Sequence, residues 1–169
     1  MNLDRWKILL DGSVPDGTEC TTVAQEYGNG MAIEMESGLF LYAFVRRLRP
    51  FRVIETGTHW GFSAACIASA LADNWSLYPS HPKPLLHTID VNAYDGRADA
   101  LLARLGLSEF AKRHIMDSRI NPLTISNPAE FIYLDADHED TSILAEWRNL
   151  APLLNRQHAF VGFHDTRLD

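Results

Sequence analysis

Acidic residues recur directly after short apolar runs along most of this sequence. Runs rich in Val, Ile, Leu and Phe are typical of buried strands. In a parallel sheet the carboxyl ends of the strands meet at one edge, where ligands usually bind. An edge lined by carboxylates would attract a cationic or hydroxyl-rich ligand. The acids in these positions are Glu55, Asp90, Asp117, Asp135 and Asp165.

The first of these acids begins a glycine-containing turn, Glu55-Thr-Gly57-Thr58-His59-Trp-Gly61-Phe-Ser63. Gly57 and Gly61 allow a tight turn and a close approach of a ligand to the backbone, and Ser63 can cap the helix expected next. The free N–H groups at the start of that helix suit a carboxylate or a phosphate. A plain strand-to-helix connection would explain the glycines as well.

Three side chains help to choose between nucleotide ligands. His59 occupies the position of the middle glycine of a dinucleotide-binding G-x-G-x-x-G turn, where it would obstruct a pyrophosphate. Glu55 would repel a phosphate but attract a sulfonium or an α-amino group. Asp90 can accept hydrogen bonds from both hydroxyls of a ribose, with helix capping as its alternative role. Together these side chains favour S-adenosylmethionine over NAD.

A second polar group follows the last two apolar runs and consists of Asp135, Asp137, His164 and Asp165. Carboxylates and an imidazole on adjacent strand ends can hold Mg²⁺ or another divalent cation, which would lower the pKa of a substrate hydroxyl. Without a metal, the same residues can act as an acid/base set, with Asp135 and His164 as the catalytic candidates. Structural hydrogen bonding is the third alternative.

The elements that must position these residues alternate along the chain. Spacing of apolar residues predicts helices over 34–48, 62–71, 97–105 and 141–154, with strands at 51–55, 85–90, 114–117, 131–135 and 159–163. Short buried strands separated by helices predict a doubly wound α/β domain with a mostly parallel sheet. Residues 1–33 are expected to form an irregular lead-in, and residues 34–169 the domain.

Composition narrows the classes of partner. The 169 residues are 46% hydrophobic and 22% charged, as expected of a single soluble domain, and no stretch approaches the ~20 apolar residues that span a bilayer. The net charge of −7 argues against nucleic acid as a partner. With no signal peptide evident, we expect a cytoplasmic protein that acts on a small molecule and not at a membrane.

These segments together resemble class I S-adenosylmethionine-dependent methyltransferases. Residues 53–63 are similar to motif I of the small-molecule O-methyltransferase branches, E-x-G-x-x-x-G-x-S, and Thr88-Ile-Asp90 resembles their ribose-binding acid. Residues 131–138 and 161–166 resemble the D-G-D-H … F-H-D signature of a methyltransferase-24-like family related to catechol and macrolide-sugar O-methyltransferases. The similarity runs from about residue 34 to residue 166.

The resemblance implies a Rossmann-like core with strand order 3-2-1-4-5 and an O-methylation of a small-molecule hydroxyl. The backbone from Gly57 to Gly61 would hold the methionine part of the cofactor and Asp90 the ribose. Asp117 and Ser118 would border the adenine, residues 35–37 would border the active site, and Asp135 also counts among the cofactor-binding candidates. The metal ligands of metal-dependent relatives correspond to Asp135, His164 and Asp165, but the family usually has an acid or an amide in place of the histidine.

The end of the chain departs from the family pattern. The sequence stops at Asp169 after the fifth expected strand, whereas class I methyltransferases continue through a helix and an antiparallel hairpin. The fifth strand would then be an unpaired edge, which a homodimer through that edge would cover; a trimmed chain is the other explanation. The alternatives to an enzyme of this class are a non-catalytic cofactor-binding or interaction protein with a truncated fold and, third, an NAD-dependent reductase.

Overall fold

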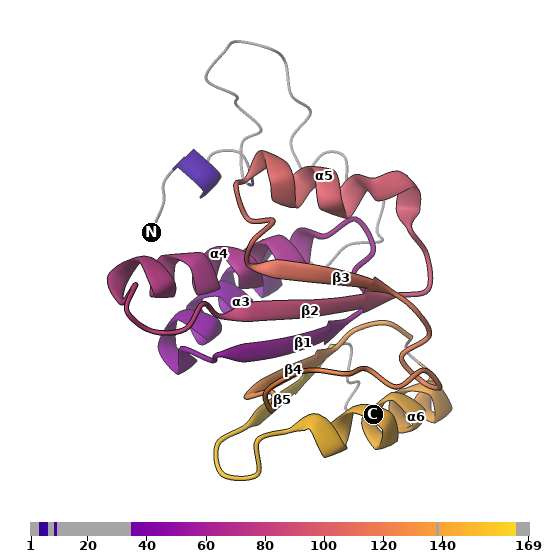
Figure 1. Ribbon diagram of the computed structural model, residues 1–169. Helices are drawn as coiled ribbons and strands as arrows, with labels where there is room; N and C mark the ends of the chain where they lie inside the picture. Colours follow the sequence, from indigo (N-terminus) through magenta and orange to yellow (C-terminus); the bar gives the residue numbers. More distant parts are fainter. Residues whose placement is uncertain (1–3, 7–8, 10–34, 138, 165–169) are drawn as a thin grey trace.

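The computed structural model describes residues 4–6, 9, 35–137 and 139–164, and its centre is a parallel sheet of five strands (Figure 1). The strand order β3-β2-β1-β4-β5 confirms the predicted 3-2-1-4-5 arrangement. The order reverses between β1 and β4, and ligands of doubly wound sheets usually bind at the carboxyl edge beside such a reversal. The strands are β1 (Arg52–Thr56), β2 (Leu85–Asp90), β3 (Ala111–Ile115), β4 (Phe131–Leu134) and β5 (Phe160–Phe163).

Helices cover both faces of the sheet, as expected of a doubly wound domain (Figure 1). The helices α3 (Met35–Leu48), α4 (Phe62–Leu77) and α5 (Arg97–Arg104) pack on one face, where Val53 and Leu86 belong to their core. Helix α6 (Asp140–Leu150) packs on the other face against Ile54 and Ile132. Neighbouring residues of a strand point to opposite faces, so consecutive residues of β1 enter different cores.

The described part of the N-terminal segment contributes to the first core. Trp6 and Leu9 are buried there, and the Trp6 ring lies edge-on to Tyr42 with centroids 4.8 Å apart. Arg5 donates hydrogen bonds to Asp73 and to the carbonyl of Leu105. The rest of the predicted irregular lead-in lies outside the described residues.

Most predicted elements are found with shifts of a few residues. Strand β3 begins at Ala111 and ends at Ile115, earlier than predicted, so Asp117 lies in the loop beyond it. Strand β1 extends to Thr56, which places Glu55 inside the strand rather than after it. Helix α6 ends at Leu150 and continues as a 3₁₀ turn containing Pro152, because proline has no N–H to extend the helical hydrogen bonds.

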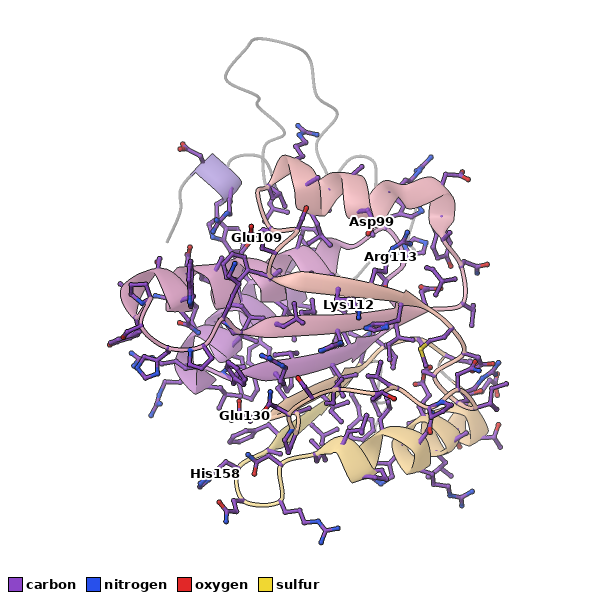
Figure 2. All side chains as sticks on the ribbon, in the orientation of Figure 1. Asp99, Glu109, Lys112, Arg113, Glu130 and His158 are labelled. Carbon is purple, nitrogen blue, oxygen red and sulfur yellow. The ribbon has the colours of Figure 1, made fainter. Side chains whose placement is uncertain are left out.

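Strand β3 forms one edge of the sheet and is linked to helix α5 by an ion pair. Arg113 on β3 forms an ion pair with Asp99 on α5, and both side chains are labelled at this junction in Figure 2.

No helix in the described part of the chain is long and apolar enough to cross a membrane.

Candidate cofactor-binding site and catalytic edge

The turn after β1 is pressed against the end of β4. Gly57 has φ +83°, and a Cβ atom at this position would lie 2.0 Å from the carbonyl oxygen of Asp135. Gly61 has φ +92°, and a Cβ there would lie 2.9 Å from the Cβ of Ala98 on α5. Backbone conformation and close packing therefore both require these glycines, before any ligand is considered.

Glu55 lies beneath this turn and is fully buried. Thr88 donates a 2.6 Å hydrogen bond to Glu55 Oε2, so the 2.6 Å contact between the two threonine hydroxyls must have Thr58 as its donor. The chain Thr58–Thr88–Glu55 connects the turn to the interior of β1 and β2. Glu55 therefore supports the turn from below, rather than lining the outer rim as the sequence pattern predicts.

The surroundings of Glu55 favour its protonated form. Burial raises the pKa of Glu55 to about 7, and the nearby charge of Asp90 acts in the same direction. The neighbouring hydroxyls of Ser63 and Thr88 lower that pKa but only partly offset the burial. Near neutral pH such a carboxyl carries a smaller average negative charge than a fully ionised one, so it attracts a cationic ligand group less strongly.

Asp90 ends β2 and holds the neighbouring backbone segments. Its Oδ2 accepts a 2.8 Å hydrogen bond from the N–H of His59, and its Oδ1 accepts a 2.9 Å bond from the N–H of Asn92. A carboxylate has about four acceptor positions, so both oxygens can still accept from a ribose hydroxyl. The structure thus brings Asp90 and the glycine turn into direct contact.

Aromatic side chains surround His59 beside Asp90. The imidazole stacks on Trp60 with centroids 5.0 Å apart and meets the edge of Tyr94 at 4.7 Å, while the Arg97 guanidinium lies over Trp60. Burial lowers the pKa of His59, which keeps the ring neutral near pH 7. This cluster gives the turn a rigid aromatic wall that its glycine pattern did not predict.

The start of α4 has no side-chain cap. The N-cap position is Gly61, in the left-handed conformation, and the first helical turn contains no acidic residue. Ser63 already lies inside the helix, and the helix has no side-chain cap, so the expectation that Ser63 caps the helix is wrong. The uncapped N–H groups remain suited to an anionic ligand group.

Asp117 and Ser118, in the loop after β3, are held from within the protein. Arg119 donates to both carboxylate oxygens of Asp117 and holds the pKa of that carboxyl below its usual range. Ser118 is buried, and its hydroxyl donates to Glu146 of α6. Glu146 is a buried carboxylate that the sequence analysis missed, because a glutamate inside an amphipathic helix normally faces solvent.

Asp135 and His164 come together at the ends of β4 and β5. The His164 Nδ1 lies 3.1 Å from Asp135 Oδ1, and these side chains are 17% and 9% exposed. Asp137 instead accepts a 2.7 Å hydrogen bond from Ser142 and lies 3.6 Å from Arg119. Two of the four residues in the second polar group are therefore adjacent, and a third has other partners.

The predicted metal site is only partly covered by the structure. Asp165 lies outside the described residues, as does His138. Within residues 35–137 and 139–164, no three His, Cys, Asp or Glu side chains are grouped so that they could hold a metal ion. The two ligand candidates that can be examined, Asp135 and His164, contact each other directly.

An apolar groove of about 510 Å³ begins at His164 and runs between α3 and the last two strands. Its walls carry several aromatic rings, with polar groups at the His164 end and on the first turn of α3. Glu36 and Ser37, from the segment predicted to border the active site, belong to these walls. Other residues that shape it are Phe40, Phe44, Tyr133 and Phe163.

Solved structures share this fold. An O-methyltransferase from Streptomyces achromogenes involved in tomaymycin synthesis, TomG in complex with SAM, is 25% identical, with 82% of this chain and 59% of that chain covered and a TM-score of 0.61. An O-methyltransferase from Bacillus cereus in complex with SAH is 20% identical (75% and 55% covered, TM-score 0.59). The SAH-bound Podospora anserina methyltransferase PaMTH1 is 15% identical (76% and 52% covered, TM-score 0.62).

The chain thus spans between half and three fifths of the length of these three structures. None of the curated proteins matches the sequence significantly. A family model described as a methyltransferase domain matches residues 54–166, which include the glycine turn, Asp90 and both residues of the Asp135–His164 pair. Because this family model matches most of the sequence, the chain belongs to this methyltransferase-domain family.

Proposed function

We propose that this chain binds S-adenosylmethionine at the carboxyl edge of β1, β2 and β4, and that the whole protein methylates a hydroxyl oxygen of a small molecule. The observation that carries the proposal is the Asp90 carboxylate, which ends β2 beside the glycine turn and keeps acceptor positions on both oxygens. The S-adenosylmethionine and S-adenosylhomocysteine complexes among the structurally similar enzymes support it.

The residues at this edge fit the parts of the cofactor. Asp90 would accept hydrogen bonds from the ribose hydroxyls, while the uncapped start of α4 would bind the methionine carboxylate. The backbone from Gly57 to Gly61, including Thr58, would lie against the methionine chain. Glu55 and Ser63 would hold the turn in position from inside the protein, since Glu55 is fully buried.

Asp135 and His164 are the proposed catalytic pair. When bound, S-adenosylmethionine would supply the methyl group of its sulfonium to the acceptor oxygen and would leave as the neutral thioether. His164 would take the hydroxyl proton, and the Asp135 carboxylate 3.1 Å from its Nδ1 would orient the imidazole and stabilise its protonated form. The apolar groove that ends at His164 would receive the rest of the acceptor.

The second form of this proposal is that a divalent cation assists the methyl transfer. Asp135, His164 and Asp165 would be its ligands, and it would lower the pKa of the acceptor hydroxyl. The contact between Asp135 and His164 is compatible with both forms, because two side chains that hold one cation lie about as close to each other as these do. A homodimer through the edge of β5 is a further proposal, checked by sedimentation velocity of the purified chain.

Calorimetric titration with S-adenosylhomocysteine tests cofactor binding. Asp90→Ala should weaken the affinity about 5- to 150-fold, equivalent to ~1 to 3 kcal/mol, through the loss of charged hydrogen bonds. NADH serves as the control ligand. Tight NADH binding without S-adenosylhomocysteine binding would replace the proposal by a reductase, and unchanged affinity in Asp90→Ala would remove Asp90 from the ribose site.

Methyl transfer to a panel of small-molecule hydroxyl compounds tests catalysis. Asp135→Ala should abolish transfer and leave S-adenosylhomocysteine binding intact. Assays with EDTA and with added Mg²⁺ distinguish the acid/base pair from the metal site. Cofactor binding without turnover on the whole panel would favour the non-catalytic alternative.

A further inference from the structure

We propose that Glu146, on α6, is a positioning residue for the cofactor-binding edge and acts through Ser118 and Thr56. The proposal rests on the proposed function, since the edge it positions is the one assigned to S-adenosylmethionine. Glu146 has no part in the sequence motifs and comes from a helix on the opposite face of the sheet from the glycine turn.

The carboxylate of Glu146 joins two segments that are far apart in the sequence. The Ser118 hydroxyl donates to Oε1, and the Thr56 hydroxyl donates to Oε2 at 3.3 Å. Thr56 Oγ1 in turn accepts a 3.2 Å hydrogen bond from the N–H of Asp135. One buried side chain thereby connects the end of β1, the loop after β3 and the first residue after β4.

Burial and charge show that this arrangement is built around an ionisable group. Glu146 is 1% exposed, and burial raises the pKa of its carboxyl. Hydrogen bonds from Ser118 and Thr56 lower that pKa, the charge of Asp137 raises it, and Arg119 lowers it again. All of these groups lie on β1, on the loop after β3 or near the start of α6.

A stabilising role alone would not explain a carboxylate at this position. Well-packed apolar groups often stabilise a protein core as much as a buried ionic group does, or more. What an apolar side chain cannot do is accept two hydroxyl hydrogens and so fix the direction of both hydroxyls. We therefore infer that Glu146 sets the backbone position of Ser118, where the adenine is expected, and of Asp135, where the acceptor is expected.

A double-mutant cycle in the affinity for S-adenosylhomocysteine tests this linkage. Glu146→Gln keeps the shape but accepts only one hydroxyl hydrogen, and it should weaken binding about tenfold. Ser118→Ala should have a similar effect, and the double variant should bind no more weakly than either single variant, because both changes break the same connection. Losses that multiply, or unchanged affinity in Glu146→Gln, would overturn the proposal.

Leu150→Ala is the matched control for a merely structural role. Leu150 is fully buried one turn further along α6, so its truncation should lower the stability while leaving the affinity within about twofold. An affinity loss in Leu150→Ala equal to that of Glu146→Gln would show that any destabilisation of α6 has this effect.

Amide hydrogen exchange tests the connection between Glu146 and Asp135 in the absence of the cofactor. The Asp135 amide should exchange at least about tenfold faster in Glu146→Gln, measured relative to the amides of β2. An unchanged Asp135 rate would refute the linkage itself. Failure of the wild-type chain to bind S-adenosylhomocysteine, with the exchange effect present, would refute the proposed function alone.

Discussion

The end of β1 is held by two buried glutamates, one on each face of the sheet. Glu55 belongs to β1 itself and accepts a hydrogen bond from Thr88, on the side covered by α4. Glu146 comes from α6 and accepts from Thr56 and Ser118 on the other side. The two side chains are 0% and 1% exposed.

The difference between these networks lies in what they hold. The Glu55 network is confined to β1, β2 and the glycine turn, which it supports through Thr58. The Glu146 network connects the ends of three strands through a helix that follows them in the sequence. The proposed ligand edge is therefore supported from inside the protein by carboxyls that do not reach its surface.

Gly57→Ala should give the largest effect, because it disrupts the backbone where the two networks meet. A Cβ atom there would overlap the Asp135 carbonyl in a left-handed conformation, so we expect a loss of about 3 to 5 kcal/mol in the free energy of unfolding. Urea denaturation measures the loss. Gly96→Ala is the control: φ is +75° there but no atom lies within 4 Å, and about 1 kcal/mol is expected. Equal losses would show that the close approach to Asp135 is not decisive.

The pH dependence of stability should separate Glu55 from ordinary carboxyls. The unfolded chain ionises this group near its usual pKa of 4.5, whereas the folded protein holds the proton until its pKa of about 7. The unfolded state thus binds fewer protons in this window, and stability should fall by about 3 kcal/mol as the pH rises from 4.5 to 7. Urea titrations across this range should show the fall in wild type.

Glu55→Gln is the variant that checks the assignment. The amide has no proton to lose, so much of the decrease between pH 4.5 and 7 should disappear. The raised pKa of Glu146 acts in the same direction and leaves a smaller residual slope. An unchanged slope in Glu55→Gln would mean that Glu55 is ionised in the folded protein.

Thr88→Val and Thr56→Val should give the smallest effects and distinguish the two faces. Each change removes hydroxyl hydrogen bonds to a buried glutamate, and a loss of about 1 to 2 kcal/mol is expected from urea denaturation. Thr88 lowers the pKa of Glu55, so Thr88→Val should move the pH-dependent decrease to higher pH. Thr56→Val should leave that midpoint in place, and a shift in both variants would mean that the networks are coupled.

Much of the fold could be predicted from local patterns. Alternating apolar runs and helical spacing located the five strands and the helices from α3 to α6. The largest error is at the end of α4, which ends at Leu77 and not at residue 71, and smaller errors occur at β3 and at the end of α6. Strand β3 was misplaced because its sequence, Ala111–Ile115, carries Lys, Arg and His at a half-covered edge and lacks the apolar signal. An edge strand needs less apolar surface than a central one.

The candidate site could be predicted only in part. The glycine turn and Asp90 follow a local motif, and the structure places them in contact. Glu55 was expected on the rim, yet β1 ends one residue later than predicted, so Glu55 lies inside the strand and in the core. Asp137 was expected beside Asp135 and His164 but pairs with Ser142 and Arg119, which no spacing rule indicates.

Apolar periodicity, a property of the local sequence, predicted the doubly wound fold, and the resemblance of several segments to a known family predicted the strand order and the family. The tertiary structure alone shows which polar residues share an environment. It buried Glu55, joined Glu146 to Ser118 and Thr56, and brought Asp135 to His164. Burial and hydrogen bonding depend on which elements pack together. For residues separated by tens of positions, the local sequence around each residue does not indicate that packing.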